Sequence, residues 1–455
     1  MNTEKKADLN GLNPIPFNQR SVSPLSYSMI FWSSTIIVQI MVIGLYLLPP
    51  AGRLNPMQVI AVGLISGTMV SIFMALQGDA GMRYGIPFII QGRSGFGIKG
   101  TRIVAIIRSV PAIAWNGIGS WIGAMAITTV TTQVFGFGNV WFSFFLLLIL
   151  QTLLSYTGLA SIKWFNSTMS IVIFAMLLYF FYVVFSTGKV NFAQFADFKG
   201  SWSLPFIAGI MGAAANYTTV MLNASDMIRH IKIGDNKESL LKRSLLANVF
   251  GVLPPWMFMV LSGMFIGLAS GAKDPIEGLV QLAPSAGFGI ILLLFIVLAQ
   301  VTSNLTLNIL PVALVFQDVL KLSWKKGVVA VAGLSVLTMP WMLFTSDYFF
   351  KFQNVYSCFL GPALGVMIAD YYFIRKKKLN LEMLYDDKGV YNYAGGYSPA
   401  GMVSLVVGAI VSFIFLDYSW LVGFPFTMIL YTVIKRMGME KKYEIQESEM
   451  KNFNS

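Results

Sequence analysis

Apolar stretches of about 20 residues recur along the whole chain, and they limit its fold more than any other feature. An α-helix needs about 20 apolar residues to cross the roughly 30 Å hydrocarbon core of a bilayer. Only 11% of the 455 residues are charged, whereas about 25% are charged in a typical soluble domain. We therefore expect an all-α integral membrane protein with twelve transmembrane helices, near residues 28–48, 57–76, 103–130, 139–160, 164–186, 204–223, 244–270, 286–318, 327–345, 352–373, 399–416 and 419–434.

Lysine and arginine are distributed unevenly over the loops between these spans. If the N-terminus is cytoplasmic, 27 of the 32 basic residues fall on the cytoplasmic side, in accordance with the positive-inside rule. The five on the other side are Arg53, Lys189, Lys199, Lys273 and Lys351. This distribution predicts a multi-pass protein of the cell (plasma) membrane with both termini cytoplasmic. It also explains the net charge of +12 by topology, without nucleic acid as a partner.

The chain has one histidine and one cysteine, His230 and Cys358. A disulfide framework and a His/Cys metal cluster are therefore excluded. An integral-membrane enzyme would need a catalytic constellation, for which these residues leave few candidates, and a channel would need a repeated filter in an oligomer. We expect a transporter that is not an enzyme.

Polar residues interrupt the first, third, sixth and eighth predicted spans. Such segments persist in hydrocarbon only where they line a cavity or another helix. The ten spans before the last two divide into two units of five, at residues 28–186 and 204–373. The first and third spans are the first and third members of one unit, and the sixth and eighth are the first and third members of the other. Because five is odd, the two units lie in opposite orientations, as do the inverted repeats of secondary transporters. We expect a central site between helices 1, 3, 6 and 8.

The remaining segments follow from the same assignment. We expect a cytoplasmic N-terminal segment, a cytoplasmic loop, two further helices and a cytoplasmic tail, at residues 1–27, 374–398, 399–434 and 435–455 respectively.

The third and sixth spans place aromatic rings beside carboxamides. Trp115 precedes Asn116, and Asn216 precedes Tyr217. A solute ring can stack on Trp115 and Tyr217, and the carboxamide of Asn308 can donate to a ring carbonyl and accept from a ring N–H. These residues favour a flat, neutral, heterocyclic amide as the solute. The small residues before Asn216 admit two interpretations, which are close helix packing and unwinding of the helix.

The eighth span carries two adjacent hydroxyls, on Thr302 and Ser303. Hard cations prefer oxygen ligands, and broken helices expose main-chain carbonyls, such as those between Ser33 and Ile36. No Asp or Glu lies mid-span in helices 1, 3, 6 or 8, which disfavours a carboxylate proton relay. We therefore favour sodium as the coupling ion, with a proton as the alternative.

Seven segments make the chain, over about residues 13–435, resemble the nucleobase:cation symporter-1 family. It is similar in particular to the bacterial hydantoin and allantoin permeases. The segments, which follow in the family's order and spacing, are RSVSPLSYSMIFW, GMRYGIPFIIQGRSGFGIKG, AWNGIGSWIGA, IKWFN, LNASDMIRHIK, TSNLTLNILPV and LGPALGVMIADYYFIRKKKLNLEMLY.

The resemblance implies a LeuT-like fold, with ten core helices in two inverted five-helix repeats and two additional C-terminal helices. It implies sodium-coupled or proton-coupled uptake by alternating access, and a solute site that contains Trp115 and Asn308. The sodium ligands that it implies are the carbonyls of Ser33, Ile36 and Ala299 and the hydroxyls of Thr302 and Ser303.

The chain departs from the hydantoin and allantoin members at two positions of this site. Tyr217 replaces a second tryptophan on helix 6, and Gly119 replaces a helix 3 glutamine four residues after the tryptophan. The loss of that glutamine removes a bidentate hydrogen-bond partner and leaves room, while Asn116 and Asn216 add carboxamides nearby. These changes predict a solute of different outline, or a larger one.

The sequence thus leads to a hypothesis of sodium-driven import of a nucleobase or related heterocycle, such as uracil, cytosine, hydantoin or allantoin. A monomer in the lipid bilayer, with a small heterocycle as its only other partner, is expected. The alternatives are a proton-coupled carrier of the same family and an amino-acid, amine or vitamin transporter with the same fold.

Overall fold

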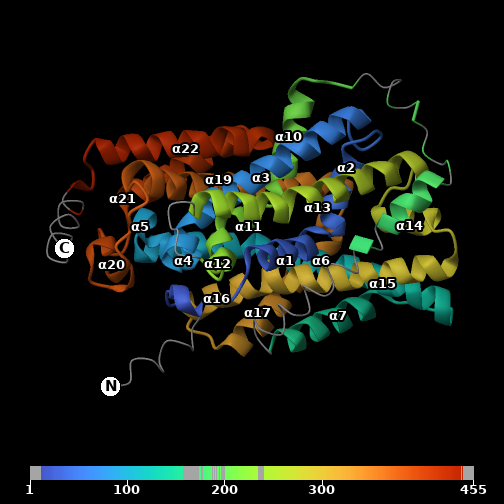
Figure 1. The fold of residues 1–455 in the computed structure, drawn as a ribbon, viewed down its shortest axis with the longest axis horizontal. Helices are drawn as coiled ribbons and strands as arrows, with labels where there is room; N and C mark the ends of the chain where they lie inside the picture. Colours follow the sequence, from blue (N-terminus) through green and yellow to red (C-terminus); the bar gives the residue numbers. More distant parts are fainter. Residues whose placement is uncertain are drawn as a thin grey trace.

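The computed structural model describes residues 12–156, 174–175, 178–186, 188, 190, 192–193, 195, 200–233, 240–441 and 443. Within these residues the protein is helical (Figure 1), and the β-structure is limited to two isolated bridges, Val22 with Ile231 and Ala394 with Tyr397. The predicted all-α class is therefore confirmed.

The first part of the chain contains a broken helix followed by three long helices. α1 and α2 are bent by 58° at the break between them. The elements are η1 (Phe17–Gln19), α1 (Pro24–Thr35), α2 (Val38–Tyr46), α3 (Pro56–Tyr84), α4 (Phe88–Gln91), α5 (Arg93–Phe96), α6 (Ile98–Phe135) and α7 (Val140–Ser155). Of the predicted fifth span, 164–186, residues 174–175 and 178–186 are described and helical, and the rest lies outside the described residues.

The second part also begins with a broken helix. It consists of α10 (Leu204–Ala215), α11 (Thr218–Leu222), α12 (Ala224–Ile228), α13 (Leu240–Ser270), α14 (Pro275–Leu282), α15 (Ala286–Ser303), η2 (Asn304–Ile309), α16 (Leu310–Val319), α17 (Trp324–Leu337), α18 (Pro340–Leu343), α19 (Ser346–Ile368) and η3 (Ala369–Ile374). Both η2 and η3 are π-helical turns that continue a longer helix.

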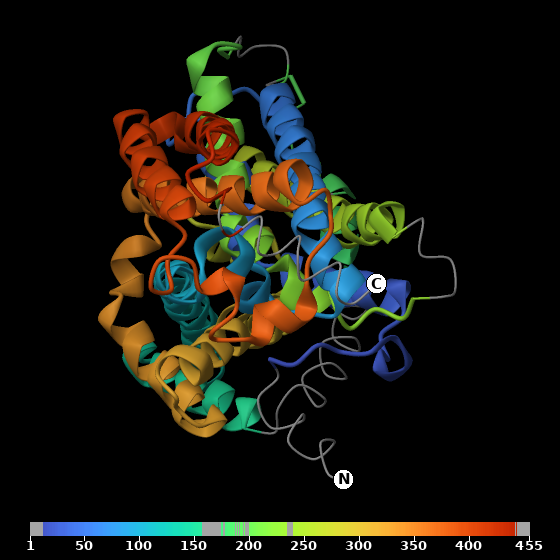
Figure 2. The same cartoon turned by 90° about the vertical axis from the view of Figure 1, so that its left-hand side faces the viewer.

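The C-terminal part contains α20 (Leu381–Tyr385), η4 (Val390–Asn392), α21 (Pro399–Ile414), η5 (Leu416–Tyr418) and α22 (Ser419–Arg436). The chain turns by 119° between α21 and the helical run that starts at Leu416. α21 and α22 lie along one margin of the molecule and pack on α19, whereas α7 and α17 form the opposite margin (Figures 1 and 2).

Length and apolar composition identify the membrane-crossing helices. Five runs qualify alone, namely Pro56–Tyr84, Ile98–Phe135, Leu240–Ser270, Ala286–Val319 and Ser346–Ile374, and two bent pairs qualify together, α1 with α2 and α21 with α22. All predicted spans except 164–186 coincide with a described helix or run of helices. The protein is therefore a multi-pass membrane protein.

Several of the observed helices, such as α3, α6 and α19, are longer than the predicted spans, and α3 shows why. It starts at a capping box, in which Asn55 and Gln58 bond to each other's main chain, and it ends only at Gly85, whose φ of 73° stops the helix. The prediction of 57–76 ended where hydropathy falls. The polar residues beyond that point stay in the helix because they have partners, such as Asp79, which accepts a hydrogen bond of 2.9 Å from Tyr371.

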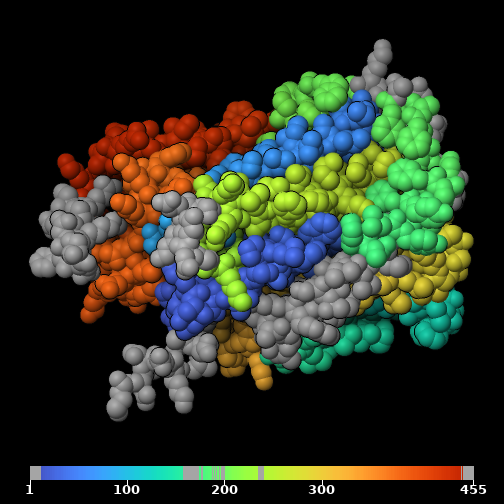
Figure 3. Space-filling view, viewed as in Figure 1, coloured from blue at the N-terminus to red at the C-terminus, as the bar shows by residue number. Residues whose placement is uncertain are grey.

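Glycines let α13 approach the first part of the chain closely. A Cβ atom on Gly44 of α2 or on Gly263 of α13 would overlap the backbone of the other helix. Gly67 of α3 lies against the Trp256 ring of α13, where an added Cβ would be only 2.7 Å from the nearest ring carbon. These contacts pack α2 and α3 closely on α13. α1 also packs on α13, so α1, α13 and α3 lie side by side on one face (Figure 3).

Candidate functional site

Trp115 lies near the middle of α6 with 6% of its surface exposed. Its ring packs edge-on against Phe349 and Phe352 of α19, with centroids 5.9 and 5.5 Å away. Its indole Nε1 donates to the hydroxyl of Tyr356, also on α19, at 3.2 Å. That hydroxyl donates in turn to the carbonyl of Ala215 at 2.8 Å. Trp115 is thus tied through Tyr356 to the last residue of α10.

The sixth predicted span breaks directly after Ala215. The N–H groups of Asn216 and Tyr217 bond to carbonyls three residues back, and Tyr217 leaves helical geometry with φ −102° and ψ 8°. The glycines upstream remain helical, and Gly212 packs against the ring of Phe350. Both interpretations of this span therefore apply, but at different residues: the glycines pack and the helix breaks at Asn216 and Tyr217.

Tyr217 connects this break to the one between α1 and α2. Its hydroxyl lies 2.9 Å from Thr35 Oγ1 and donates to the Ser34 carbonyl at 3.2 Å. Its ring packs edge-on against Trp256, 5.4 Å away. Trp115 and Tyr217 therefore rest on different neighbours. Beside Tyr217, the side-chain Nδ2 of Asn216 is buried without a hydrogen-bond partner.

The carboxamides of the eighth span form a connected set in the π-helical turn η2. Asn308 donates to Asn304 Oδ1 at 3.0 Å, so the two side chains share a helix face as their spacing indicates. Asn304 Nδ2 is shared among Asn116 O, Gln151 Oε1 and Ser120 Oγ, 3.1 to 3.3 Å away. Asn304 thus anchors α6 and α7, while Asn308 stands at the end of the set with 7% exposure.

Asn116 does not share the surroundings of Trp115. Its Nδ2 donates to the Ser335 hydroxyl of α17 at 2.9 Å, whereas Trp115 faces α19. Consecutive residues of an α-helix point about 100° apart, which accounts for the separation. Asn116 is fully buried and contributes to the contact between α6 and α17.

Gly119 lies one turn after Trp115, and the expected room beside it is absent. A Cβ on Gly119 would lie 2.7 Å from Asn304 Oδ1 and 3.0 Å from Gln300 Oε1. Carboxamides from the eighth span occupy the space that a longer side chain at 119 would fill. The expectation that Gly119 leaves room for a larger solute is therefore wrong.

Two further residues close to this region were not among the sequence-based candidates. Tyr356 lies in an aromatic-rich helix where nothing in the sequence distinguishes it. Gln300 belongs to the polar run AQVTSN, and it accepts a hydrogen bond of 2.9 Å from Gln39 Nε2 of α2. The polarity of Gln300 within an apolar span could have marked it as a candidate, but only the structure shows its contact with Gly119.

The break between α1 and α2 redirects main-chain hydrogen bonds. In a continuous helix the N–H groups of Ile37 and Ile40 would bond to the carbonyls of Ser33 and Ile36. They bond instead to Thr35 O at 2.9 Å and Ile37 O at 3.1 Å. The carbonyls of Ser33 and Ile36, two of the predicted sodium ligands, have therefore lost their helical partners.

The remaining predicted ligands lie on α15. Thr302 Oγ1 donates to Ala299 O at 2.9 Å and keeps its lone pairs for a further contact. Ser303, the last residue of α15, is also buried. The Gln39–Gln300 hydrogen bond joins α2 to α15 beside Ala299. The five residues offer neutral oxygens only, which suits a monovalent hard cation, and no metal-binding cluster of His, Cys, Asp or Glu exists among the residues that the structure describes.

A buried guanidinium lies seven residues before Trp115. Arg108 is fully buried and donates to the carbonyls of Thr219, at 3.2 Å, and Leu307, at 3.3 Å. These residues lie close in sequence to Tyr217 and Asn308. One side chain therefore joins α6 to α11 and η2 immediately beside the predicted solute residues.

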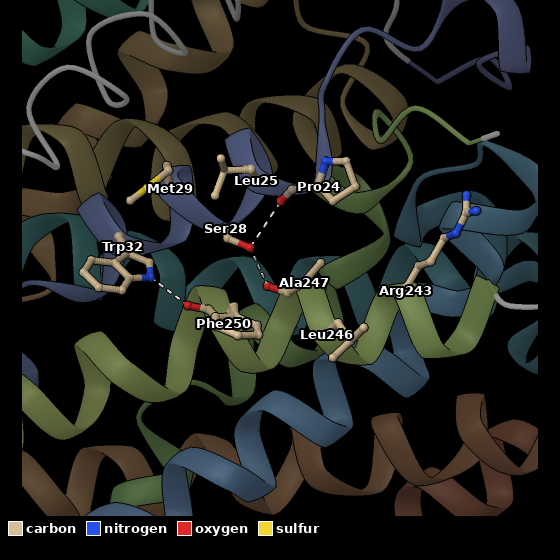
Figure 4. A pocket seen from close by; sticks show the side chains of 9 residues that line it. All are labelled: Pro24, Leu25, Ser28, Met29, Trp32, Arg243, Leu246, Ala247 and Phe250. Carbon is tan, nitrogen blue, oxygen red and sulfur yellow. Dashed lines mark hydrogen bonds between the residues drawn. The ribbon is translucent and has the colours of Figure 1, made fainter.

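A lateral pocket of about 630 Å³ lies elsewhere, between α1 and α13 (Figure 4). Its lining is almost wholly apolar and includes Leu25, Met29 and Phe250. Ser28 at its wall is bonded to Pro24 O and Ala247 O. None of the predicted site residues lines this pocket, so it is distinct from the central region.

Comparison with known proteins identifies the family. A sequence model described as "Permease for cytosine/purines, uracil, thiamine, allantoin" matches residues 14–435. The hydantoin permease of Microbacterium maritypicum is 26% identical over 468 residues, which cover 99% of this chain and 93% of that protein. The allantoin permease of Bacillus subtilis (strain 168) is 27% identical over 423 residues, which cover 84% of each.

Solved structures show the same fold. Mhp1, a nucleobase-cation-symport-1 family transporter in a closed conformation with bromovinylhydantoin bound, has a TM-score of 0.84 at 24% identity, with 96% of this chain and 99% of that chain covered. A Na⁺-coupled sialic acid symporter has a TM-score of 0.61 at 12% identity, covering 92% and 90%. These neighbours confirm the LeuT-like fold.

The relatives are permeases, so the protein is a transporter and not an enzyme. Since the family model extends over nearly the whole chain, the protein belongs to the family of permeases for cytosine and purines, uracil, thiamine and allantoin, the nucleobase:cation symporter-1 family that its sequence motifs resemble.

Proposed function

We propose that the protein is a secondary active symporter that imports a nucleobase or related heterocycle of the uracil, cytosine, hydantoin and allantoin class together with sodium. The class of solute is supported by the family and by the named relatives, a hydantoin permease and an allantoin permease. In the central region, the Trp115 ring supplies a stacking surface, and the carboxamides of Asn216 and Asn308 supply hydrogen bonds to a ring amide.

The observation that carries sodium coupling is the redirection of two N–H groups away from Ser33 O and Ile36 O. In a membrane interior such carbonyls need another partner. Together with Ala299 O and the hydroxyls of Thr302 and Ser303, they form a neutral oxygen set for a bound Na⁺. The ion would supply positive charge at the junction of α1, α2 and α15.

Coupling then follows from the side chains at that junction. An ion held by both helices keeps α1 in place against α15. Because Tyr217 bonds to Ser34 O and Thr35 Oγ1, the same ion positions the break in the sixth span, where the solute binds. The ion and the solute therefore stabilise the same closed conformation of the protein, and binding of one increases the affinity for the other.

Alternating access is supported by the shared fold. Mhp1 has been solved both in a closed conformation and in an inward-facing one. The distribution of basic residues supports cytoplasmic termini. In that orientation a membrane potential of 100 mV, inside negative, contributes about 2.3 kcal/mol to the import of each sodium ion.

Uptake into proteoliposomes tests the proposal. Radiolabelled hydantoin, allantoin, uracil and cytosine are offered under an inward sodium gradient, and accumulation of at least one above its external concentration is expected. Equal uptake with potassium in place of sodium would contradict sodium coupling. Accumulation driven by a pH gradient in sodium-free buffer would identify the proton instead. Amino acids and vitamins serve as competitors that test the alternative solute classes.

A further inference from the structure

Gln39 and Gln300 form a buried carboxamide pair between α2 and α15. Their exposed fractions are 3% and 0%, and Gln39 Nε2 donates to Gln300 Oε1 at 2.9 Å. The other ends of both side chains, Gln39 Oε1 and Gln300 Nε2, have no hydrogen-bond partner. The amide oxygen and nitrogen of both residues can be interchanged without breaking the hydrogen bond between them. In either assignment, one carbonyl oxygen and one amino group of the pair are left without a hydrogen-bond partner.

The Gln300 side chain follows α6 towards Trp115. Its Cβ lies 3.8 Å from a Cβ placed on Gly123, and its Oε1 lies 3.0 Å from one placed on Gly119. The side chain therefore runs from Gly123 back to Gly119, in a groove that exists because both positions lack side chains. Gly119 is one helical turn from Trp115, so the carboxamide ends about one turn of α6 from the residue whose ring we propose stacks on the solute.

Burial makes the unused hydrogen-bonding groups informative. A polar group that is buried without a hydrogen-bond partner costs free energy. Here a free acceptor and a free donor lie in one place, so a ligand that both donates and accepts hydrogen bonds would satisfy them. Asn304, which also reaches Gly119, cannot be that occupant's main partner because its Nδ2 is already shared among three acceptors. The Gln39–Gln300 pair, in contrast, still has one hydrogen-bond acceptor and one donor free.

We propose that Gln300 and Gln39 act as one specificity-determining pair, in which the free amino group of one carboxamide donates to a ring C=O of the transported heterocycle and the free carbonyl of the other accepts from a neighbouring ring N–H. This inference rests on the proposed function and narrows it. It selects rings in which the N–H and the C=O next to the pair are unsubstituted, and it disfavours rings alkylated at that nitrogen. The pair acts in addition to Asn308 and supplies from the eighth span the carboxamide that helix 3 lacks at Gly119.

A protein-by-ligand cycle tests this proposal. Gln300→Met keeps an unbranched side chain of similar length in the groove and removes both polar groups. Binding of hydantoin, 1-methylhydantoin and 3-methylhydantoin, and of uracil and its 1-methyl and 3-methyl forms, is measured in sodium buffer by tryptophan fluorescence. In the wild type, methylation at one ring nitrogen is expected to weaken binding about 10-fold or more, which corresponds to about 1.4 kcal/mol. In Gln300→Met that same methylation is expected to weaken binding less than about 3-fold.

Gln77→Met provides a matched control, since Gln77 is also a buried glutamine with an unpartnered Oε1 but donates to Leu222 O and lies on α3. It should retain the full methylation penalty of the wild type. If Gln300→Met does not accumulate as folded protein, the same methylation penalties are measured in Gln39→Met, which removes the other carboxamide of the pair. The sodium dependence of binding is recorded for each variant.

The outcomes are distinguishable. Equal methylation penalties in the wild type and in Gln300→Met overturn the inference, including the case in which an ordered water occupies the pair, while heterocycle binding by the wild type leaves the proposed function standing. A uniform loss of affinity for every ligand together with weakened sodium dependence also overturns it, because that pattern indicates a structural role at the ion site. Failure of the wild type to bind any of the six heterocycles overturns this inference, and failure in addition to accumulate allantoin or cytosine in proteoliposomes overturns the proposed function.

Discussion

The indole nitrogen of Trp115 lies 3.2 Å from the hydroxyl oxygen of Tyr356, and through this bond the ring that we propose stacks on the solute is held by a residue of another helix. The same hydroxyl donates to Ala215 O, the last carbonyl of α10. A single phenol therefore sets both the orientation of the indole and the end of the helix before the break.

Tyr356→Phe should weaken solute binding about 10-fold. The ring would keep its contact with Phe352, 5.0 Å away, but the indole N–H and the Ala215 carbonyl would each lose a buried partner, at a cost of about 1–3 kcal/mol. Fluorescence titration with hydantoin or uracil measures the change, and a melting curve in detergent shows that the variant folds.

Tyr418→Phe is the control for that variant. Tyr418 also donates its hydroxyl to a main-chain carbonyl, that of Leu204 at 3.3 Å, but this hydrogen bond is exposed to solvent. Its removal should leave affinity within about 2-fold of the wild type. Wild-type affinity in Tyr356→Phe would show that the phenol does not position the indole.

Thr302→Val combined with Ser303→Ala should raise the sodium concentration needed for half-maximal uptake at least about 10-fold. Both changes keep the packing volume close to the original and remove the two hydroxyls that we propose as ligands. Uptake at low and high sodium in proteoliposomes measures the shift.

Thr306→Val tests whether any buried hydroxyl on this helix has the same effect. Thr306 lies one turn further along and donates to Thr302 O at 2.9 Å, but it is not among the proposed ligands. Its sodium dependence should match the wild type. If Thr306→Val and the double variant shift alike, the assignment of ligands is incorrect.

Gly119→Ala should destabilise the protein by about 1–3 kcal/mol and reduce solute affinity. The added methyl would lie 2.7 Å from Asn304 Oδ1 and 3.0 Å from Gln300 Oε1, which outweighs the gain of about 1 kcal/mol in helix propensity. Gly333→Ala in α17 is the matched control, since it lies in a helix with nothing within 4 Å of the new Cβ. That variant should be unchanged or slightly more stable, and equal melting temperatures for the two variants would contradict the crowding at Gly119.

Asp370→Asn should lower stability by about 3–5 kcal/mol, the cost of removing the acidic partner of a buried ion pair. The carboxylate of Asp370 accepts hydrogen bonds from Ser94, Arg375 and Tyr431, at 2.7 to 2.8 Å, and so joins α5, η3 and α22. Asp417→Asn, at an exposed position, should change stability by less than about 0.5 kcal/mol. Melting curves in one detergent compare the two, and similar curves would show that the Asp370 network does not stabilise the fold.

Hydropathy and polar interruptions were sufficient to predict much of this architecture. Apolar length depends on the thickness of a bilayer, which is the same for every span, so most spans were found to within a few residues. The break near Ser33 to Ile36 was also predictable, because polar residues persist in hydrocarbon only where they line a cavity or another helix. For the sixth span the sequence left close packing and unwinding as alternatives, and the structure shows both.

Other features depend on which helices meet, and hydropathy carries no such information. Tyr356 is one aromatic among many in its helix, and only the proximity of α19 to α6 and α10 gives it a role. Gly119 was interpreted as vacant space because its own side chain is absent, but Gln300 and Asn304 enter that space from α15 and η2. Asn116, adjacent to Trp115 in sequence, faces α17.

The redirected hydrogen bonds at the break between α1 and α2 have a kinetic consequence. Two carbonyl oxygens there, on Ser33 and Ile36, cannot return to helical partners while Ile37 and Ile40 remain bonded as they are. Whatever ligand these oxygens hold must be replaced by another and not simply lost, because bare carbonyls in a dry interior are costly. For the cation that we propose at this break, release and entry of water are therefore a single exchange, and such an ion can leave only through an opening that is already hydrated.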